Sequence, residues 1–497
     1  MGVPRFIIAA VAVAMTISTA APAAGMPPLT HRSGCAAHLA DRFAPATGTT
    51  NRHGDLRVIG VQYKQDVANV RSYRSFRTTM RCLMRELVLP NERRGEKTLV
   101  VFNEDIGLMT AATGARGKLV RQQATTGAPA GDGEPVDAAT ALAELNAEYA
   151  PQIAAYQARF GPIDPRKQLF VGATDTFARA FSITFSRLAR RYGVYVVASN
   201  NQPRYRQSTD PADIAMFADP AIAKPKAAFV ATSQTVHNTT YLWGPHVVKP
   251  HAPQGERNLL FRNYKVPLTD LEATLLDLDP GPSTGKAAIR NARGHVVAGH
   301  RLGFATSLPA FVYGYPIGQR PRHFKPCADL SVTYMACMDR LGVDTLVQAE
   351  ANPGRWAANG GANDWQPLDW MGSAWRAVAD PTVHFRYAIN PMMVGNLLDL
   401  DFDGQSAILA RHRDGRRQHY VGDAHLVPGD GDPVTAKPYI GGKSQFLALA
   451  PWVIADGSRA KLRAEGARLA AGSGDPQEND YLETAVYADL TPDKGHR

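Results

Sequence analysis

The sequence predicts a mixed α/β fold in which helices cover β-sheets. Two observations support this prediction: short runs rich in β-branched residues, and longer segments whose apolar residues recur at helical spacing. The two kinds of segment alternate along the first part of the chain, as expected when helices pack on a sheet. Strand, helix, strand, helix and strand are predicted at residues 56–63, 72–89, 98–102, 177–192 and 194–198.

The second half of the chain is richer in predicted strands. Residues of about 110–170 interrupt the pattern and are interpreted as an insertion, which either caps a site or elaborates the surface. We assign residues 55–490 to one domain, because 497 residues with 44% apolar content can build a large core. Further strands are predicted at 227–232, 239–243, 259–265, 343–348, 406–410 and 484–489, and a helix at 330–341.

The formal charge of +10 does not indicate nucleic-acid binding. Lys and Arg are scattered, and the short clusters at 187–191 and 411–417 carry no interleaved aromatic residues. A solvated basic surface is the favoured interpretation, and attraction to an anionic cell envelope is the alternative.

The N-terminus has the pattern of a secretory signal. A single charge at Arg5 precedes the apolar stretch 6–18, and small residues follow at 19–24. We therefore expect a signal peptide at 1–24, or an uncleaved anchor, then a leader at 25–54 and a secreted or envelope location. Export permits disulfides, so Cys35 and Cys82 either pair or remain separate thiols.

Two charged groups stand at the ends of predicted strands. Glu104 follows the apolar run 98–102, so it lies at the carboxyl edge of a sheet, where desolvation raises a pKa and suits a general base. Lys265 ends another strand, and Glu272 follows it seven residues later. A lysine beside a carboxylate stays charged when partly buried and can stabilise an oxyanion.

A cysteine completes this set. Cys327 precedes the predicted helix 330–341, where the helix dipole stabilises a thiolate and the N–H of Ala328 can face a developing negative charge. Cys337 lies within that helix among Tyr334, Met335 and Met338, so core packing is its expected role.

Taken in order, these segments resemble the carbon–nitrogen hydrolase (nitrilase) superfamily. The segment ending at Glu104 is similar to that family's Val-Val-Phe-Pro-Glu, with Asn103 in place of Pro. Lys265 resembles its lysine, and Glu272 the second glutamate of several branches. Cys327 and the two residues after it resemble its Cys-x-Asp, and Gly342 resembles the glycine that closes the next helix.

The resemblance implies a four-layer αββα sandwich and a reaction that uses neither metal nor organic cofactor. Glu104 would deprotonate Cys327, whose thiolate would attack the substrate carbon and form a thioester that water hydrolyses. Lys265 and the Ala328 N–H would stabilise the tetrahedral intermediate, and Glu272 would orient Lys265 or assist proton transfer. A small amide is favoured over a nitrile, because nitrilases commonly carry Cys-Trp-Glu where this chain has Cys-Ala-Asp.

Other interpretations of the same residues stay open. One is a catalytically silent extracellular binding protein on the same fold, and another is an acyltransferase that passes the acyl group to an amine. Members of this family often oligomerise, so a homo-oligomer is a further expectation. The expected partner is a small amide or nitrile, with no role for nucleic acid.

Overall fold

A computed structural model describes most of the chain beyond residue 33. The described residues are 34–40, 43–126, 137–353, 371–398, 400–402, 404–411, 445–451 and 482–491. They all fall within one compact unit, His31–Arg497. The predicted signal segment 1–24 lies outside the described residues. No helix in the described ranges is both long enough and apolar enough to span a membrane.

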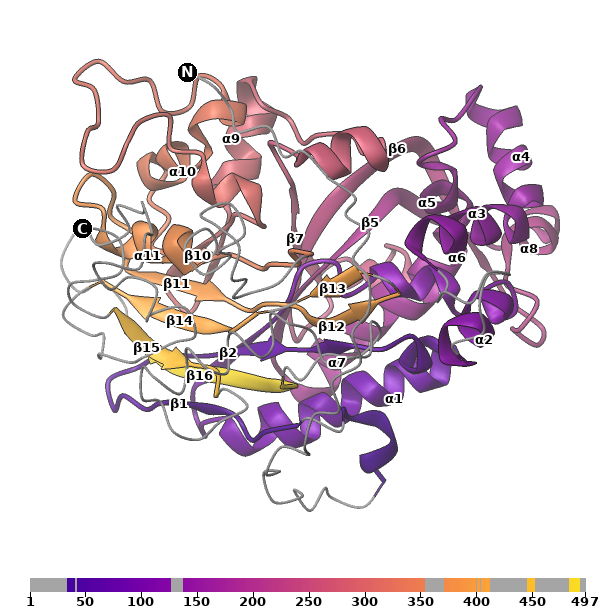
Figure 1. The fold of residues 1–497 in the computed structure, drawn as a ribbon, viewed down its shortest axis with the longest axis horizontal. Helices are drawn as coiled ribbons and strands as arrows, with labels where there is room; N and C mark the ends of the chain where they lie inside the picture. The colour runs from indigo at the N-terminus through magenta and orange to yellow at the C-terminus, as the bar shows by residue number, and fades with distance from the viewer. Residues whose placement is uncertain are drawn as a thin grey trace, which may run out of the picture. The chain divides into compact units, whose positions relative to one another are not determined.

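The first sheet has seven strands, and the predicted strand–helix alternation builds its centre (Figure 1). Neighbours β2, β4 and β5 run parallel, whereas β6 and β7 are antiparallel additions. The run Leu99 to Phe102 is buried throughout, as expected of a strand covered on both faces. In sheet order the strands are β1 (Thr47–Thr49), β16 (Thr484–Leu490), β2 (Leu56–Gln62), β4 (Lys97–Phe102), β5 (Tyr195–Ser208), β6 (Ala228–Trp243) and β7 (Leu259–Tyr264).

The second sheet has six strands, with a parallel centre formed by β9, β10 and β11. A small three-stranded sheet joins β3 (Lys64–Gln65) to the hairpin β12 (Val394–Leu397) and β13 (Leu400–Phe402). In order, the second sheet contains β15 (Phe446–Leu449), β14 (Ala407–Ala410), β11 (Tyr387–Asn390), β10 (Thr345–Val347), β9 (His300–Phe304) and β8 (His295–Val297).

The two large sheets pack face to face through one apolar core. Side chains of both sheets meet there and are almost fully buried, so the sheets form a sandwich. From the first sheet come Val58, Val101, Val197 and Val486, and from the second come Leu302, Val347, Ile389 and Ile408.

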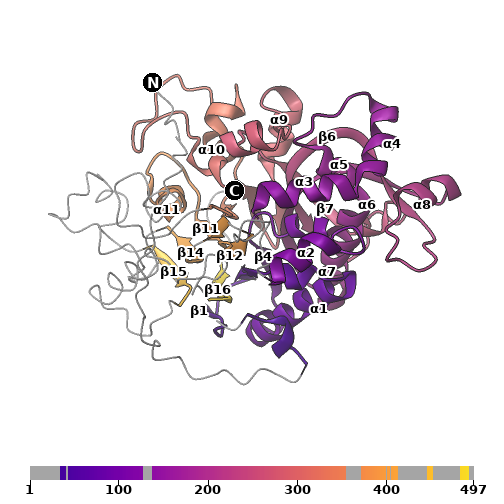
Figure 2. The same ribbon diagram turned by 45° about the vertical axis from the view of Figure 1, so that its right-hand side comes forward.

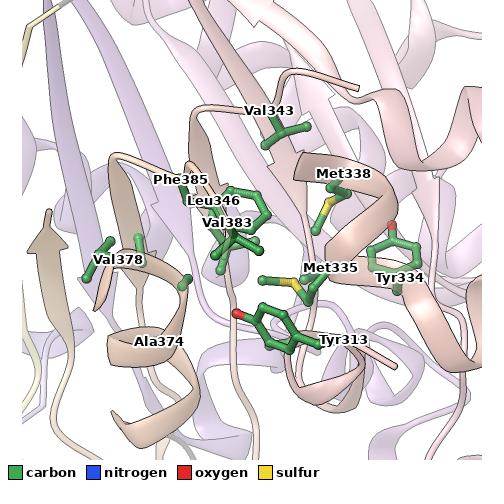
Figure 3. Close-up of a cluster of buried hydrophobic side chains, with 14 of the residues drawn as sticks. Tyr313, Tyr334, Met335, Met338, Val343, Leu346, Ala374, Val378, Val383 and Phe385 are labelled. Atoms are coloured by element: carbon green, nitrogen blue, oxygen red, sulfur yellow. The ribbon is translucent and has the colours of Figure 1, made fainter. Parts of the chain in front are cut away.

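Helices cover the outer face of each sheet. Over the first sheet lie α1 (Tyr73–Leu83) and α7 (Ile183–Tyr192), where Phe185 packs edge-on against Phe102 of β4. Over the second sheet lie α9 (Gly285–Arg293), α10 (Leu330–Arg340) and α11 (Gly372–Ala379). Figure 3 shows Tyr334, Met335 and Met338 of α10 in the buried cluster that seals this layer. The predicted αββα order is therefore confirmed.

The insertion at about 110–170 is helical. It contains α2 (Lys118–Thr126), α3 (Ala138–Glu148), α4 (Ala150–Phe160) and α5 (Gln168–Gly172), and α6 (Thr174–Phe177) follows it. Tyr156 of α4 accepts a hydrogen bond from the Ala231 N–H of β6, and Gln152 donates to Met216 in α8 (Pro211–Phe217). The insertion thus packs on the early part of β6 and on α8, and Figure 2 shows these helices gathered together.

Two parts of the sheet prediction were wrong. The strands predicted at 227–232 and 239–243 are one continuous strand, β6, because residues 236–238 between them pair with residues 201–203 of an extended β5. The pairing shifts between Pro203 and Tyr205, so the proline sits at an irregularity, where its missing N–H is tolerated. Strand β9 was not predicted, and it carries a residue of the site described below.

A buried ion pair fastens β16 to β2. The Arg57 Nε lies 2.5 Å from the Asp489 Oδ1, and the Arg57 Nη2 donates to Oδ2 at 2.9 Å. The N–H of Asn51 also donates to Asp489, at 2.7 Å. Both charged side chains are nearly inaccessible, so Arg57 depends on Asp489 for its counter-charge, whereas Asp489 also pairs with Arg93 at 3.2 Å.

Asp489→Asn is expected to lower the free energy of unfolding by about 3–5 kcal/mol, because Arg57 then stays buried without its counter-charge. Urea unfolding measures the loss. The control Asp164→Asn breaks an exposed pair with Arg166 and is expected to leave the urea midpoint near that of the wild type. Equal midpoints for Asp489→Asn and wild type would contradict this role of the pair.

Candidate active site

Three of the residues predicted for the site form one buried cluster. The Lys265 Nζ lies 2.8 Å from the Glu104 Oε1 and 2.8 Å from the Glu272 Oε2. The three residues are only 2–4% exposed. The structure therefore brings together the carboxylates and the ammonium that the sequence analysis singled out separately.

Strand ends position these groups. Glu104 follows β4, and Lys265 follows β7 with its N–H donating to the Asn238 carbonyl at 3.0 Å. Glu272 lies in the short π-helix η8 (Leu271–Leu275). The backbone N–H and the hydroxyl of Thr269 both donate to its Oε2, at 2.9 and 2.8 Å. These two donors hold the Glu272 carboxylate in position independently of its contact with Lys265.

Asn238 of β6 bridges the two carboxylates. Its Nδ2 donates to the Glu104 Oε1 at 2.8 Å and to the Glu272 Oε1 at 2.7 Å. The sequence analysis did not include Asn238 among the site residues. The signal that could have pointed to Asn238 was an amide side chain on the strand next to the one that Lys265 follows.

Burial and charge separate the two carboxylates chemically. Burial, and then the neighbouring Glu272, raise the pKa of Glu104, although Lys265 and Asn238 partly oppose the rise. Burial acts in the same sense on Glu272, but Lys265 and the Thr269 N–H outweigh it and lower its pKa. Burial disfavours the charge on Lys265, yet the two carboxylates outweigh it and raise the pKa of the ammonium. Glu104 is thus the more basic carboxylate, beside a lysine that stays charged.

Ser307 occupies a strained position just past β9. Its φ of 57° and ψ of −122° lie where a residue with a side chain rarely sits. It is 2% exposed, and its N–H donates to the Ala349 carbonyl at 3.2 Å. A sharp turn between a strand and a helix presents a hydroxyl at a sheet edge, as in the nucleophile elbow of α/β-hydrolases. Here the helix is η9 (Leu308–Phe311).

The segment after β10 links Ser307 to Glu104. The Ser307 Oγ donates to the Asn352 Oδ1 at 3.3 Å, and the adjacent Ala351 N–H donates to the Glu104 Oε2 at 3.2 Å. Ser307 and Glu104 therefore contact consecutive residues of one segment. The second sheet supplies the hydroxyl, and the first sheet supplies the base and the cation.

A third buried carboxyl, Glu350, lies in the same segment. Burial, and then the nearby Glu104, raise the pKa of Glu350 to about 8, so it is protonated at neutral pH. Gln348 and Asn352 donate to its two oxygens, at 2.6 and 3.0 Å. Glu350 thus holds the Asn352 side chain that receives the Ser307 hydroxyl, without adding a charge at pH 7.

The structure contradicts the predicted nucleophile. Cys327 forms a disulfide with Cys337, so neither sulfur is a free thiol. Residues 322–326, which would have been the strand before a nucleophile, are not a strand. Cys337 lies in the buried cluster of the outer helical layer, on the far side of the second sheet from the sandwich core. The set of Glu104, Lys265 and Cys327 is therefore wrong in its third member.

The predicted oxyanion donor fails with it. The Ala328 N–H donates to the Lys325 carbonyl at 3.3 Å, within a turn next to the disulfide. It is therefore engaged locally and does not face the buried cluster. The other pair, Cys35 and Cys82, does form the disulfide that the sequence analysis left open, and it ties the start of the described chain to α1.

Ser307 could not be singled out from the sequence. Strand β9 reads His-Arg-Leu-Gly-Phe, with too few apolar residues to stand out as a strand. Only the backbone conformation at Ser307 and its neighbours distinguish it from other serines. Among the described residues, no group of three His, Cys, Asp or Glu side chains is arranged to hold a metal ion.

Comparisons with known proteins return structures only. No protein-family model and no curated protein matches the sequence. An amidase from Nesterenkonia sp. matches at 12% identity and a TM-score of 0.35, covering 73% of this chain and 86% of that one. Saccharomyces cerevisiae Nit3, a member of branch 10 of the nitrilase superfamily, matches at 13% and 0.36, covering 81% and 89%.

A carbon–nitrogen hydrolase from Helicobacter pylori G27 also matches, at 12% identity and a TM-score of 0.36, covering 72% of this chain and 84% of that one. These structural neighbours come from the superfamily that the order of motifs resembles.

Proposed function

We propose that the protein hydrolyses a carbon–nitrogen bond of a small amide through an ester formed on Ser307. The observation that carries the proposal is a hydroxyl at a strained strand end, joined through segment 351–352 to a buried base and a buried cation. A hydroxyl is a weak nucleophile unless a base removes its proton, and Glu104 has the raised pKa that such a base requires.

In the first half of the reaction, the Ser307 Oγ attacks the amide carbonyl carbon and its proton passes to Glu104. The Glu104 Oε1 already accepts from Lys265 and Asn238, whereas the one described donor to Oε2 is the Ala351 N–H, at 3.2 Å. Oε2 is therefore the oxygen that takes the proton. The carbonyl oxygen becomes an oxyanion as the carbon becomes tetrahedral.

Two donors are suited to that oxyanion. An ammonium has three N–H bonds, and Lys265 directs two of them at carboxylates, which leaves the third for the substrate. The N–H of Leu308 belongs to the first turn of η9, where N–H groups have no partner within the helix. It follows the nucleophile directly, as oxyanion donors do at other strand-to-helix turns.

In the second half, the tetrahedral intermediate collapses and the carbon–nitrogen bond breaks. Glu104 returns its proton to the leaving nitrogen, so ammonia or an amine departs and an ester remains on Ser307. Glu104 then takes a proton from water, which attacks the ester, and gives it back to the Ser307 oxygen as the acid leaves. Glu272 and Asn238 act by positioning Lys265 and Glu104 throughout.

We also propose that the protein works outside the cytoplasm. The signal-like pattern at 1–24 supports this, and so do two disulfides, because such bonds persist in oxidising compartments.

Ser307→Ala is expected to lower kcat/KM for ammonia release from an amide panel by about a thousandfold or more, because the covalent route is lost. A fluorophosphonate probe should label the wild type on the peptide that contains Ser307. The matched control, Cys327→Ser with Cys337→Ser, removes both sulfurs and is expected to keep turnover and labelling. An active Ser307→Ala protein, or loss of activity only in the cysteine double variant, would contradict the mechanism.

Glu272→Gln is expected to shift the acid limb of kcat/KM to lower pH. Glu104 must be ionised to act as a base, so the rate rises as the pH increases through its raised pKa. Removal of the Glu272 charge removes one cause of that rise in pKa, and the limb moves down. Glu350→Gln is the control, because Glu350 has a pKa of about 8 and is neutral across the acid limb. An upward shift in Glu272→Gln would exclude Glu104 as the base.

A further inference from the structure

A basic cavity lies on the outer helical layer of the first sheet. It has a volume of about 620 Å³ and opens between α1 and α7, beside the segment that follows β6. Five arginines line it: Arg77 and Arg81 from α1, and Arg187, Arg190 and Arg191 from α7. Their side chains converge although they come from helices about a hundred residues apart in the sequence.

This cavity is separate from the candidate active site. Helix α7 ends at Tyr192 just before β5 begins, and β6 ends at Trp243, which pairs with Val196 near the start of β5. Glu104 follows the opposite end of β4, which runs parallel to β5. The arginines near the end of α7 therefore lie toward one edge of the first sheet, and the Glu104 cluster lies toward the other.

The five arginines form no ion pair with a described carboxylate. The Nε of Arg81 is buried and has no hydrogen-bond partner. Burial, and then the like charges of Arg187, Arg74 and Arg81, lower the pKa of Arg77. Such crowding of guanidinium groups is unfavourable unless an anion relieves it.

Ordinary helix chemistry explains only part of this arrangement. Arg190 and Arg191 lie in the last turn of α7, where a cation is favourable beside the helix dipole. Arg81 lies in the last turn of α1, whereas Arg77 and Arg187 do not lie in a last turn. Arg74, Arg77 and Arg81 recur at a spacing that puts them on one face of α1, away from Phe76 and Met80 on the buried face. The polar face of α1 therefore lines part of the cavity and is not simply a face exposed to water.

We propose that this cavity binds a phosphate-rich anion, either a free oligophosphate or the headgroups of an anionic lipid surface. Guanidinium groups bind phosphate oxygens through paired N–H bonds. Five guanidinium groups around one cavity suit a ligand with several phosphates better than a ligand with a single phosphate. The volume falls in the range of small-molecule sites, which is about 300–1,000 Å³. The described residues that line the cavity include no Phe, Tyr or Trp on which a base could stack, which sets the cavity apart from nucleic-acid surfaces.

Binding of inorganic tripolyphosphate to the full chain, measured by isothermal titration calorimetry at low salt, tests the proposal. Arg77→Gln with Arg187→Gln is expected to weaken binding at least about tenfold, because two charge-assisted contacts are lost. Arg77→Lys with Arg187→Lys keeps the charge and should lie between this variant and the wild type. The control, Arg290→Gln with Arg293→Gln, makes the same charge change on exposed residues of α9 and should bind like the wild type.

A parallel flotation assay with phosphatidylglycerol vesicles, against phosphatidylcholine vesicles, distinguishes the two sources of phosphate. The cavity is assigned to lipid headgroups if the wild type binds the vesicles, the Arg77 and Arg187 glutamine variant does not, and tripolyphosphate binds weakly. Tripolyphosphate binding without vesicle binding assigns it to a free oligophosphate. Absence of binding in both assays, or equal loss in the α9 control, overturns the proposal.

Discussion

The ammonium of Lys265 between two buried carboxylates is the contact on which the site depends. Its partners come from the end of β4 and from η8, and β5 and β6 lie between β4 and β7 in the sheet. A buried charge without a partner is costly, so each of the three groups requires the other two. Asn238 of β6 adds an uncharged donor between the carboxylates, so Glu104 and Glu272 lie close together around a single cation.

The packing of the sandwich sets the remaining geometry. Ser307 belongs to the second sheet and the charged cluster to the first, so their separation is fixed by how the sheets meet. The inter-sheet core sets that contact, and a hydrogen bond of 2.8 Å between Thr240 of β6 and Thr306 pins it directly beside the serine. Backbone strain at Ser307 is held by the same surroundings, since its N–H is bonded to the strand-end carbonyl of Ala349.

The sequence allowed half of the site to be predicted, for a physical reason. Glu104 and Lys265 follow strands with strong patterns, so their place at a sheet edge could be inferred. Ser307 follows β9, where Gly303 interrupts the pattern. A Cβ at Gly303 would lie 2.6 Å from Val343 and 2.8 Å from Met338, so the glycine allows α10 and the next turn to approach the strand closely. Cys327 was predicted as the nucleophile from its thiol and its place before a helix. Its disulfide with Cys337 depends on how the folded chain brings the two residues together.

The position of β16 has a consequence for how the chain reaches its folded form. Residues 484–490 lie inside the first sheet, between β1 and β2, and pair with β2 along its whole length. During synthesis, β2 can pair with β4 early, but more than four hundred further residues must be made before its second neighbour exists. The sheet that carries Glu104 and Lys265 is completed only after residues 484–490 have been made. Under the export that we propose, such a delay is an advantage, because an early stable core would obstruct passage across the membrane.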